Sequence, residues 1–358
     1  MPTLVVEEDR VLRLVQIVLD PGTPAERTSA YADYMAHDVD LIAWRDALRA
    51  RIPGLYPAHV RLVTNADELQ RELPSADVVI IESLELGARE LAAAPKLKWV
   101  QTFGAFALHI DERACRARNL PVHTVRRRTN RVVAEHTMML MLALAKRLPL
   151  INGLVTPGRL VAAGFGSRPY DTRHTPGANF ARIPGLRALA GSILGLLGFG
   201  EIAREVAAMA RPFGMELLYH KRARLTPEEE REAGVTYSSF EELFARSDYL
   251  SIHVPSSAET RDLVDAAALR RMKCGAFLVN TSRAAIVNQQ ALLDAIASGH
   301  LGGVGLDVLY EEPAANDEPL LRYQNVILTP HVAGASRMNG LADLQDMLIG
   351  IWQGIRDL

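Results

Sequence analysis

The stretch ILGLLGFGEIAREVA, residues 193–207, decides the fold of this chain. A short apolar run leads into a turn that contains Gly198 and Gly200, and helical spacing follows the turn. Gly198 permits the tight turn, a side chain at Gly200 would collide with a bound pyrophosphate, and Ala203 lets helix and strand touch. The stretch therefore predicts an α/β unit whose helix N-terminus binds the phosphates of a dinucleotide, with a tight turn that binds nothing as the alternative.

The next strand, within LLYHKRAR at residues 217–224, bears on the choice of dinucleotide. Such a strand normally ends in an acid that binds the adenine ribose. Here His220 takes that place, and Lys221, Arg222 and Arg224 follow it. Cations at this position could pair with a ribose 2′-phosphate. The sequence thus favours NADP(H), while NAD(H) stays possible and a solvated basic helix cap is the alternative.

Short apolar runs alternate with helical spacing along the whole chain, which predicts parallel sheets in an α/β fold. A length of 358 residues exceeds what one core usually supports, so we expect two domains. The runs expected to form strands fall into two series, one at 12–19, 60–64, 76–83, 97–104 and 121–125, and one at 192–198, 215–220, 249–255, 275–281, 303–309 and 325–330.

Composition excludes several classes of protein. The formal net charge is −2, which gives no attraction to nucleic acid or to anionic membranes. Cys115 and Cys274 are the only cysteines, and the histidines show no metal-ligand spacing, so we expect neither a disulfide scaffold nor a metal. The apolar run 137–145 is too short to span a bilayer, and no signal peptide is evident, so we expect a cytoplasmic protein. The basic run 125–131 is interpreted as a solvated or salt-bridged crossing between domains.

Three polar residues follow three successive strands of the second series. Arg283 follows AFLVN, Glu312 follows GVGLDVL, and His331 follows VILTP. Ligands of open α/β sheets bind beyond the carboxyl ends of the strands, where these residues would meet. An arginine can bind a carboxylate and polarise the adjacent carbonyl, and a histidine can donate a proton near neutral pH. A carboxylate beside the histidine would orient its ring, so this set suits hydride transfer to a carbonyl.

These motifs resemble those of the D-isomer-specific 2-hydroxyacid dehydrogenases, and of glyoxylate and hydroxypyruvate reductases among them. The similar segments are GLLGFGEIA, LVNTSRAAIV, GLDVLYEEP and TPHVAGAS, in the family's order, and the similarity extends over about residues 76–345. The resemblance implies two Rossmann-like or flavodoxin-like domains with parallel sheets and an active-site cleft between them. It further implies a substrate-binding domain at 1–130 plus 335–358, a nucleotide-binding domain at 131–334, and a homodimer.

The resemblance also implies roles for individual residues. Arg283 would bind and polarise the 2-oxo acid, His331 would be the acid/base, and Glu312 would support His331. The backbone around Ser83, Gly104 and Ala105 would contact the substrate carboxylate. The residues expected at the cofactor are Gly198, Phe199, Gly200, Glu201, Ile202, His220, Lys221, Arg222, Val254, Pro255, Thr260, Thr281, Ser282, Arg283, Asp307, near the carboxamide, His331 and Gly334.

The chain also departs from the family pattern. Phe106 and Leu108 interrupt a small-and-acidic pattern in the substrate loop, so the identity of the substrate stays open. The segment 156–185, rich in Gly, Pro and Arg, is interpreted as a long loop or excursion. Two other functions remain as alternatives. One is oxidation of formate or phosphite on the same fold, and the other is a dinucleotide-sensing corepressor.

Overall fold

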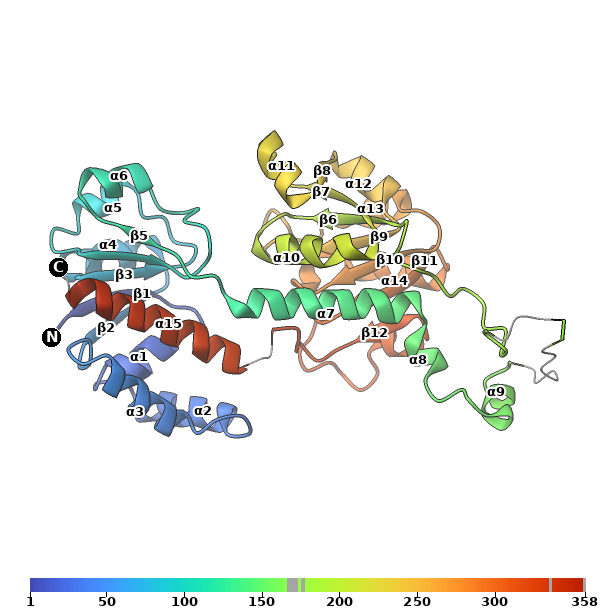
Figure 1. Cartoon of the computed structure of the whole chain (residues 1–358), viewed down its shortest axis with the longest axis horizontal. Helices are drawn as coiled ribbons and strands as arrows, with labels where there is room; N and C mark the ends of the chain where they lie inside the picture. The colour runs from blue at the N-terminus through green and yellow to red at the C-terminus, as the bar shows by residue number, and fades with distance from the viewer. Residues whose placement is uncertain (166–172, 175–177, 335–336, 357–358) are drawn as a thin grey trace. The chain divides into compact units, whose positions relative to one another are not determined.

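A computed structural model describes residues 1–165, 173–174, 178–334 and 337–356 (Figure 1). The chain forms two compact units, Met1–Thr129 with Ser336–Leu358, and Asn130–Ala335. Each unit contains one parallel sheet, of five strands in the first and seven in the second. The prediction of an α/β fold with two parallel sheets is confirmed.

The sheet of the first unit has the strand order β2-β1-β3-β4-β5, which is the flavodoxin-like order. Its helix α15 comes from the far end of the chain, yet Leu344 and Leu348 of α15 lie in one core with Leu4 and Trp99 of the sheet. The elements are β1 (Thr3–Glu7), α1 (Arg13–Leu19), α2 (Ala25–Met35), α3 (Leu41–Arg51), β2 (His59–Val63), α4 (Ala66–Glu72), η1 (Leu73–Ser75), β3 (Val78–Ile81), α5 (Ala88–Ala92), β4 (Trp99–Thr102), α6 (Glu112–Ala117), β5 (Val122–His123) and α15 (Arg337–Arg356).

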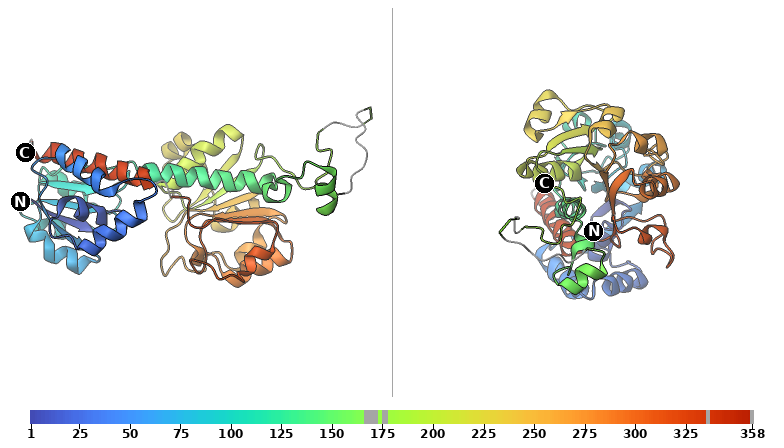
Figure 2. Two further views of the ribbon diagram at one scale, coloured as in Figure 1. Left: turned by 90° about the horizontal axis from the view of Figure 1, so that it is seen from below. Right: turned by 90° about the vertical axis from the view of Figure 1, so that its right-hand side faces the viewer.

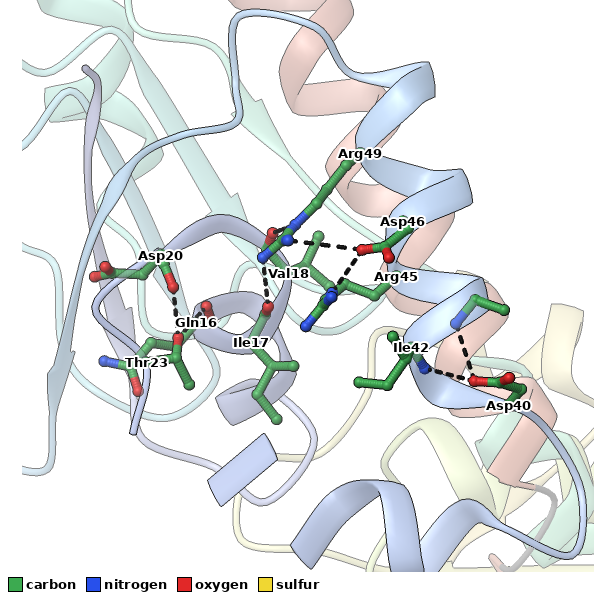
Figure 3. Close-up of polar contacts among 11 residues, drawn as sticks. Gln16, Ile17, Val18, Asp20, Thr23, Asp40, Ile42, Arg45, Asp46 and Arg49 are labelled. Carbon is green, nitrogen blue, oxygen red and sulfur yellow. Dashed lines mark hydrogen bonds and ion pairs between the residues drawn. The ribbon is translucent and has the colours of Figure 1, made fainter. Parts of the chain in front are cut away.

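The segment 12–19 is the helix α1, so the prediction of a strand there is wrong. A short, wholly apolar run is compatible with a buried strand or a buried helix, and periodicity cannot separate the two. The structure shows what holds the helix in place: Arg49 donates from Nε to the Val18 carbonyl at 2.7 Å and from Nη2 to the Ile17 carbonyl at 3.1 Å (Figure 3). These charged donors satisfy carbonyls that the end of a helix leaves free. The first strand is instead β1, which the sequence analysis missed.

The sheet of the second unit has the order β12-β11-β10-β9-β6-β7-β8. Counted within the unit, this is the Rossmann order 3-2-1-4-5-6 with one further strand, and the order reverses between β6 and β9. The elements are α7 (Arg128–Ala145), α8 (Leu148–Ile151), α9 (Pro157–Ala162), β6 (Ile193–Leu197), α10 (Glu201–Ala210), η2 (Arg211–Phe213), β7 (Glu216–His220), α11 (Pro227–Ala233), β8 (Thr236–Tyr237), α12 (Phe240–Arg246), β9 (Tyr249–Ile252), α13 (Ala266–Arg271), β10 (Ala276–Asn280), η3 (Ala284–Ile286), α14 (Gln289–Ala297), β11 (Leu301–Leu306), η4 (Pro319–Arg322) and β12 (Val326–Leu328).

Helices cover both faces of the second sheet. Residues of α7 and α10 form one core with Leu194 and Leu196 of β6, and residues of α12, α13 and α14 form another with Leu197 and Leu250. The two views in Figure 2 show α7, in green, lying along this sheet. The apolar run 137–145 therefore belongs to a helix that packs one face against this sheet and leaves Met139 exposed. Among the described residues, no helix is long and apolar enough to cross a membrane.

The excursion 156–185 contains a short helix, α9, which begins after the N-cap Thr156. The parts of this segment at 166–172 and 175–177 lie outside the described residues. The six runs of the second series all contain a strand, whereas the two-residue strand β8 was not predicted.

Candidate active site

The turn between β6 and α10 requires glycine at one position and leaves open space at another. Gly198 has φ +91°, and a Cβ atom there would lie 2.6 Å from the backbone oxygen of His253. Gly200 is the N-cap of α10, and a Cβ atom there would meet nothing within 4 Å. The backbone at the start of α10 is thus open to a ligand, and its free N–H groups suit a phosphate. The residues present fit a dinucleotide.

The side chains around this turn belong to the core more than to a ligand site. The ring of Phe199 is buried and lies 4.9 Å from that of Tyr219, centroid to centroid. Ile202 packs against the same core. Glu201, in the first turn of α10, accepts a hydrogen bond from Asn130 Nδ2 at 2.5 Å. Phosphates would therefore be bound at this turn by the backbone.

The cations after β7 differ in how far they are already neutralised. Arg224 donates twice to the Glu230 carboxylate, at 2.8 and 3.0 Å. Arg222 is 92% exposed and pairs with the exposed Glu259 at 3.1 Å, an interaction that water weakens. His220 is held by a contact of 3.0 Å between its Nδ1 and the Ser238 carbonyl. Arg222 is therefore more readily available to an anionic ligand than Arg224 is.

Two loops at the carboxyl end of the sheet are tied together by hydroxyl groups. Ser282 Oγ donates to the Val254 carbonyl at 2.5 Å, which joins the loop after β10 to the loop after β9. Thr260 Oγ1 donates to the Pro255 carbonyl at 2.7 Å and closes the second loop on itself. Thr281 is buried against helix α7, where its hydroxyl lies 3.0 Å from that of Thr137.

Glu312 and His331 form a direct pair at the same edge. His331 Nδ1 lies 2.7 Å from Glu312 Oε2, and the Leu309 N–H donates to Glu312 Oε1 at 2.9 Å. Burial raises the pKa of Glu312, but these hydrogen bonds and the charges of His331 and Arg283 outweigh it and hold the pKa below its usual value. The structure thus brings the predicted carboxylate and imidazole together, close enough to Arg283 for the arginine to influence the carboxylate.

The loop with His331 is held by Asp307, a residue that the sequence analysis also expected near the nicotinamide carboxamide. His331 has φ +54°, a left-handed conformation that few residues other than glycine adopt. The buried Asp307 carboxylate accepts hydrogen bonds from the N–H groups of Val332 at 2.9 Å and Ala333 at 2.7 Å. Gly334 lies in the turn that follows. The carboxylate therefore fixes the backbone on the C-terminal side of His331.

The expected substrate residues lie at the carboxyl edge of the first sheet, and one of them is already engaged. Glu7 Oε2 accepts hydrogen bonds from the N–H groups of Glu82, Ser83 and Leu84, that of Ser83 at 2.8 Å. The Ser83 hydroxyl donates to the other oxygen, Oε1. Burial raises the pKa of Glu7, yet these hydrogen bonds together lower it below its usual value. Glu7, which the sequence analysis missed, thus occupies the amides that Ser83 was expected to offer.

The segment after β4 combines a buried glycine with exposed apolar side chains. Gly104 is buried, and its carbonyl accepts a hydrogen bond from the Val125 N–H at 2.9 Å. Phe106 and Leu108 are 42% and 78% exposed. These apolar side chains lie where the family pattern is small and acidic.

The basic run 125–131 is largely neutralised by carboxylates. Arg127 pairs with Glu82 at 2.5 Å, Arg128 with Asp343 at 2.9 Å, and Arg131 with Glu135 at 3.6 Å. These pairs agree with the interpretation as a salt-bridged segment. In the described part of the chain, no group of three or more His, Cys, Asp or Glu side chains is placed to hold a metal ion.

Comparison with known proteins gives a consistent result. Residues 138–333 match the family model of the D-isomer specific 2-hydroxyacid dehydrogenase NAD binding domain. The chain is 35% identical to a glyoxylate reductase of Thermococcus litoralis over 71% of this chain and 73% of that protein. It is 30% identical to a chloroplastic/mitochondrial formate dehydrogenase of Arabidopsis thaliana over 80% and 72%. The apo D-mandelate dehydrogenase of Rhodotorula graminis shares the fold, with a TM-score of 0.58, 23% identity and coverage of 98% and 92%.

Proposed function

The chain belongs to the D-isomer specific 2-hydroxyacid dehydrogenase family, and we propose that it transfers a hydride between a nicotinamide dinucleotide and a small 2-oxo or 2-hydroxy acid. The observation that supports this most directly is the 2.7 Å pair of Glu312 and His331, at the sheet edge that also holds Arg283 and the glycine turn. Similarity to a glyoxylate reductase supports glyoxylate-like 2-oxo acids as substrates.

In this proposal each side chain of the site has a separate role in the reaction. A nicotinamide dinucleotide, when bound, would provide the hydride chemistry at C2 of the substrate. Arg283 binds the substrate carboxylate and polarises the 2-oxo group. His331 donates a proton to the oxygen as the alcohol forms, and it takes that proton back in the oxidation direction. Glu312 orients the ring through Nδ1, which leaves Nε2 for the substrate.

The preferred cofactor in this proposal is NADP(H). Lys221 and Arg222 follow β7 without any carboxylate at the tip of the strand, and Arg222 has only an exposed partner. A ribose 2′-phosphate would form ion pairs with both cations, whereas the neutral 2′-hydroxyl of NAD(H) would be stabilised little by them.

The proposed assembly is a homodimer formed through the second unit. Among the described residues between 139 and 186, six large apolar side chains are more than one-third exposed, namely Met139, Leu148, Val155, Val161, Phe180 and Leu186. Such concentration of exposed apolar area within one segment is typical of an interface.

Cys115 and Cys274 are both free, which supports a reducing compartment such as the cytoplasm.

A spectrophotometric screen tests the proposal. The purified chain is offered glyoxylate, hydroxypyruvate, pyruvate and phenylpyruvate with NADPH, and separately with NADH, while absorbance at the nicotinamide band is followed. We expect 2-oxo acid reduction, faster with NADPH, and we expect Arg222→Ala to raise the KM for NADPH more than for NADH. An equal effect on both cofactors would contradict the 2′-phosphate assignment. Oxidation of formate or phosphite without reduction of any 2-oxo acid would favour the formate-type alternative, and binding of dinucleotide with no turnover would favour a corepressor.

A further inference from the structure

A histidine outside the Arg283, Glu312 and His331 set reaches the loop that contains His331. His136 lies within helix α7, and its side chain is 13% exposed. Its Nε2 atom is 3.0 Å from Thr329 Oγ1 and 3.4 Å from Asp307 Oδ1. Thr329 directly follows β12 and stands two residues before His331. His136 and Thr329 are 193 positions apart in the sequence, so a helix distant in the chain contacts this loop.

The donors and acceptors of this cluster determine how its atoms must pair. Thr329 Oγ1 donates to Asp307 Oδ1 at 2.5 Å, so the hydroxyl proton is used there. Toward the His136 ring the hydroxyl oxygen can then act only as an acceptor, which requires a proton on Nε2 of His136. Asp307, 1% exposed, accepts from Thr329 on one side of His331 and from Val332 and Ala333 on the other. A buried carboxylate needs such partners, so the cluster is strongly constrained.

We propose that His136 is a positioning residue for His331, acting through Thr329 and Asp307. The inference rests on the proposed function, in which the imidazole of His331 must meet the substrate oxygen. His331 is held in a left-handed backbone conformation while its ring stays 2.7 Å from Glu312. The left-handed backbone and the contact of the ring with Glu312 both require that the loop stay fixed on each side of His331. The Nε2–H of His136 bonds to Thr329, which precedes His331. Asp307 in turn accepts hydrogen bonds from Thr329 on one side of His331 and from Val332 and Ala333 on the other.

The same part of helix α7 also contacts the strand end that precedes Arg283. The hydroxyl of Thr137, the next residue, lies 3.0 Å from the hydroxyl of Thr281, and both are buried. Adjacent residues of one helix therefore support the loop of the proton donor and the segment before the substrate-binding arginine. Helix α7 therefore helps to position the segments of the site, in addition to packing in the core.

The test compares a donor-removing variant with a donor-keeping one. His136→Leu removes the Nε2–H group, whereas His136→Gln places an amide N–H near the same position. A matched control is His300→Gln, because His300 is also half-buried and contacts a backbone carbonyl, that of Leu269, at 3.0 Å in the same unit. For each protein, kcat and KM for the 2-oxo acid, the dissociation constant for NADPH and the thermal melting curve are measured.

We expect His136→Leu to lower kcat by about 10- to 100-fold, since small misplacement of a catalytic group costs this much. The KM for the 2-oxo acid and the affinity for NADPH should change little, and His136→Gln should recover most of the lost kcat. Wild-type kcat in His136→Leu, an equal loss in His300→Gln, or a His136→Gln variant no better than the leucine variant would each overturn the proposal.

A second readout does not depend on turnover. The imidazole ¹H–¹⁵N signals of His331 should shift in His136→Leu and stay in place in His300→Gln, because only the first change frees the loop. If the wild-type chain reduced no 2-oxo acid, the proposed function would fail while this spectrum still decided the positioning role. Unchanged His331 signals in His136→Leu would contradict that role.

Discussion

At the scale of single residues, the pairing of Glu312 with His331 sets how the site responds to pH. The pKa of Glu312 lies below its usual value, since hydrogen bonds and nearby cations outweigh the effect of burial. The side chain is therefore a carboxylate across the neutral range, and it gives Nδ1 of His331 a negatively charged hydrogen-bond partner.

Replacing Glu312 by Gln tests this electrostatic support. The amide keeps the size of the side chain and loses the charge, so the ring of His331 loses its ionic partner. Because the pKa of Glu312 is lowered, wild-type reduction should lose this support only at a pH below the usual range of a carboxyl group. Glu312→Gln should lack the support at every pH, and its kcat at neutral pH should be lower by about tenfold or more. Profiles of kcat against pH for the wild type and the variant give the result. Superimposable profiles would show that the carboxylate does not support His331.

The residues of the site differ in how well the sequence reveals them. Arg283, Glu312 and His331 could be predicted because each lies within a few residues of the end of one of three successive strands, and parallel strands end at one edge. Glu7 and His136 could not. Their contacts join positions 76 and 193 residues apart, and such distant hydrogen bonds leave no periodic pattern in a single sequence.

At the scale of elements, the turn between β6 and α10 was predictable in detail, whereas α1 was not. Two glycines and an alanine at fixed spacing define the turn by steric need. The run 12–19 is uniformly apolar, so its helical state depends on burial by the surrounding core and on Arg49, which bonds to its last carbonyls from a different helix. Tertiary contacts of this kind override local pattern.

The two glycines of the turn should respond differently to alanine. Gly198→Ala forces a Cβ against the His253 backbone at φ +91°, so we expect the free energy of unfolding to fall by at least about 1–3 kcal/mol. Gly200→Ala meets no protein atom and should keep the wild-type melting temperature while it weakens dinucleotide binding. Thermal melts and NADPH titrations of both variants test the pair. Tight NADPH binding by a stable Gly200→Ala variant would mean that the pyrophosphate does not approach this residue.

At the scale of the whole molecule, the alternation of strands and helices was enough to predict two parallel sheets. The strand orders 2-1-3-4-5 and 3-2-1-4-5-6 then follow the common rules for doubly wound folds, and the second is extended by β12. The return of the chain to the first unit through α15 was implied by the family resemblance, because nothing in the helix's own sequence identifies the core on which it packs.

The exposed apolar side chains of residues 139–186 predict the state of association. We expect the chain to run in light scattering at twice the mass of one 39.3 kDa subunit. Val155→Asp combined with Val161→Asp should give a monomer, since both side chains are more than half exposed and would place charges in an apolar interface. A matched pair of changes on another exposed face, Tyr34→Asp with Ile42→Asp, should leave the mass unchanged. A monomeric wild type would contradict the proposed homodimer.

The central claim is that Arg283 and His331 act directly on a 2-oxo acid beside a bound nicotinamide, and stopped-flow reduction by NADPH tests it most directly. We expect His331→Ala and Arg283→Ala to bind NADPH with wild-type affinity and to reduce the substrate about 10²- to 10⁴-fold more slowly, the usual contribution of a general acid. Full turnover by His331→Ala would contradict the account, because the proton would then come from another group.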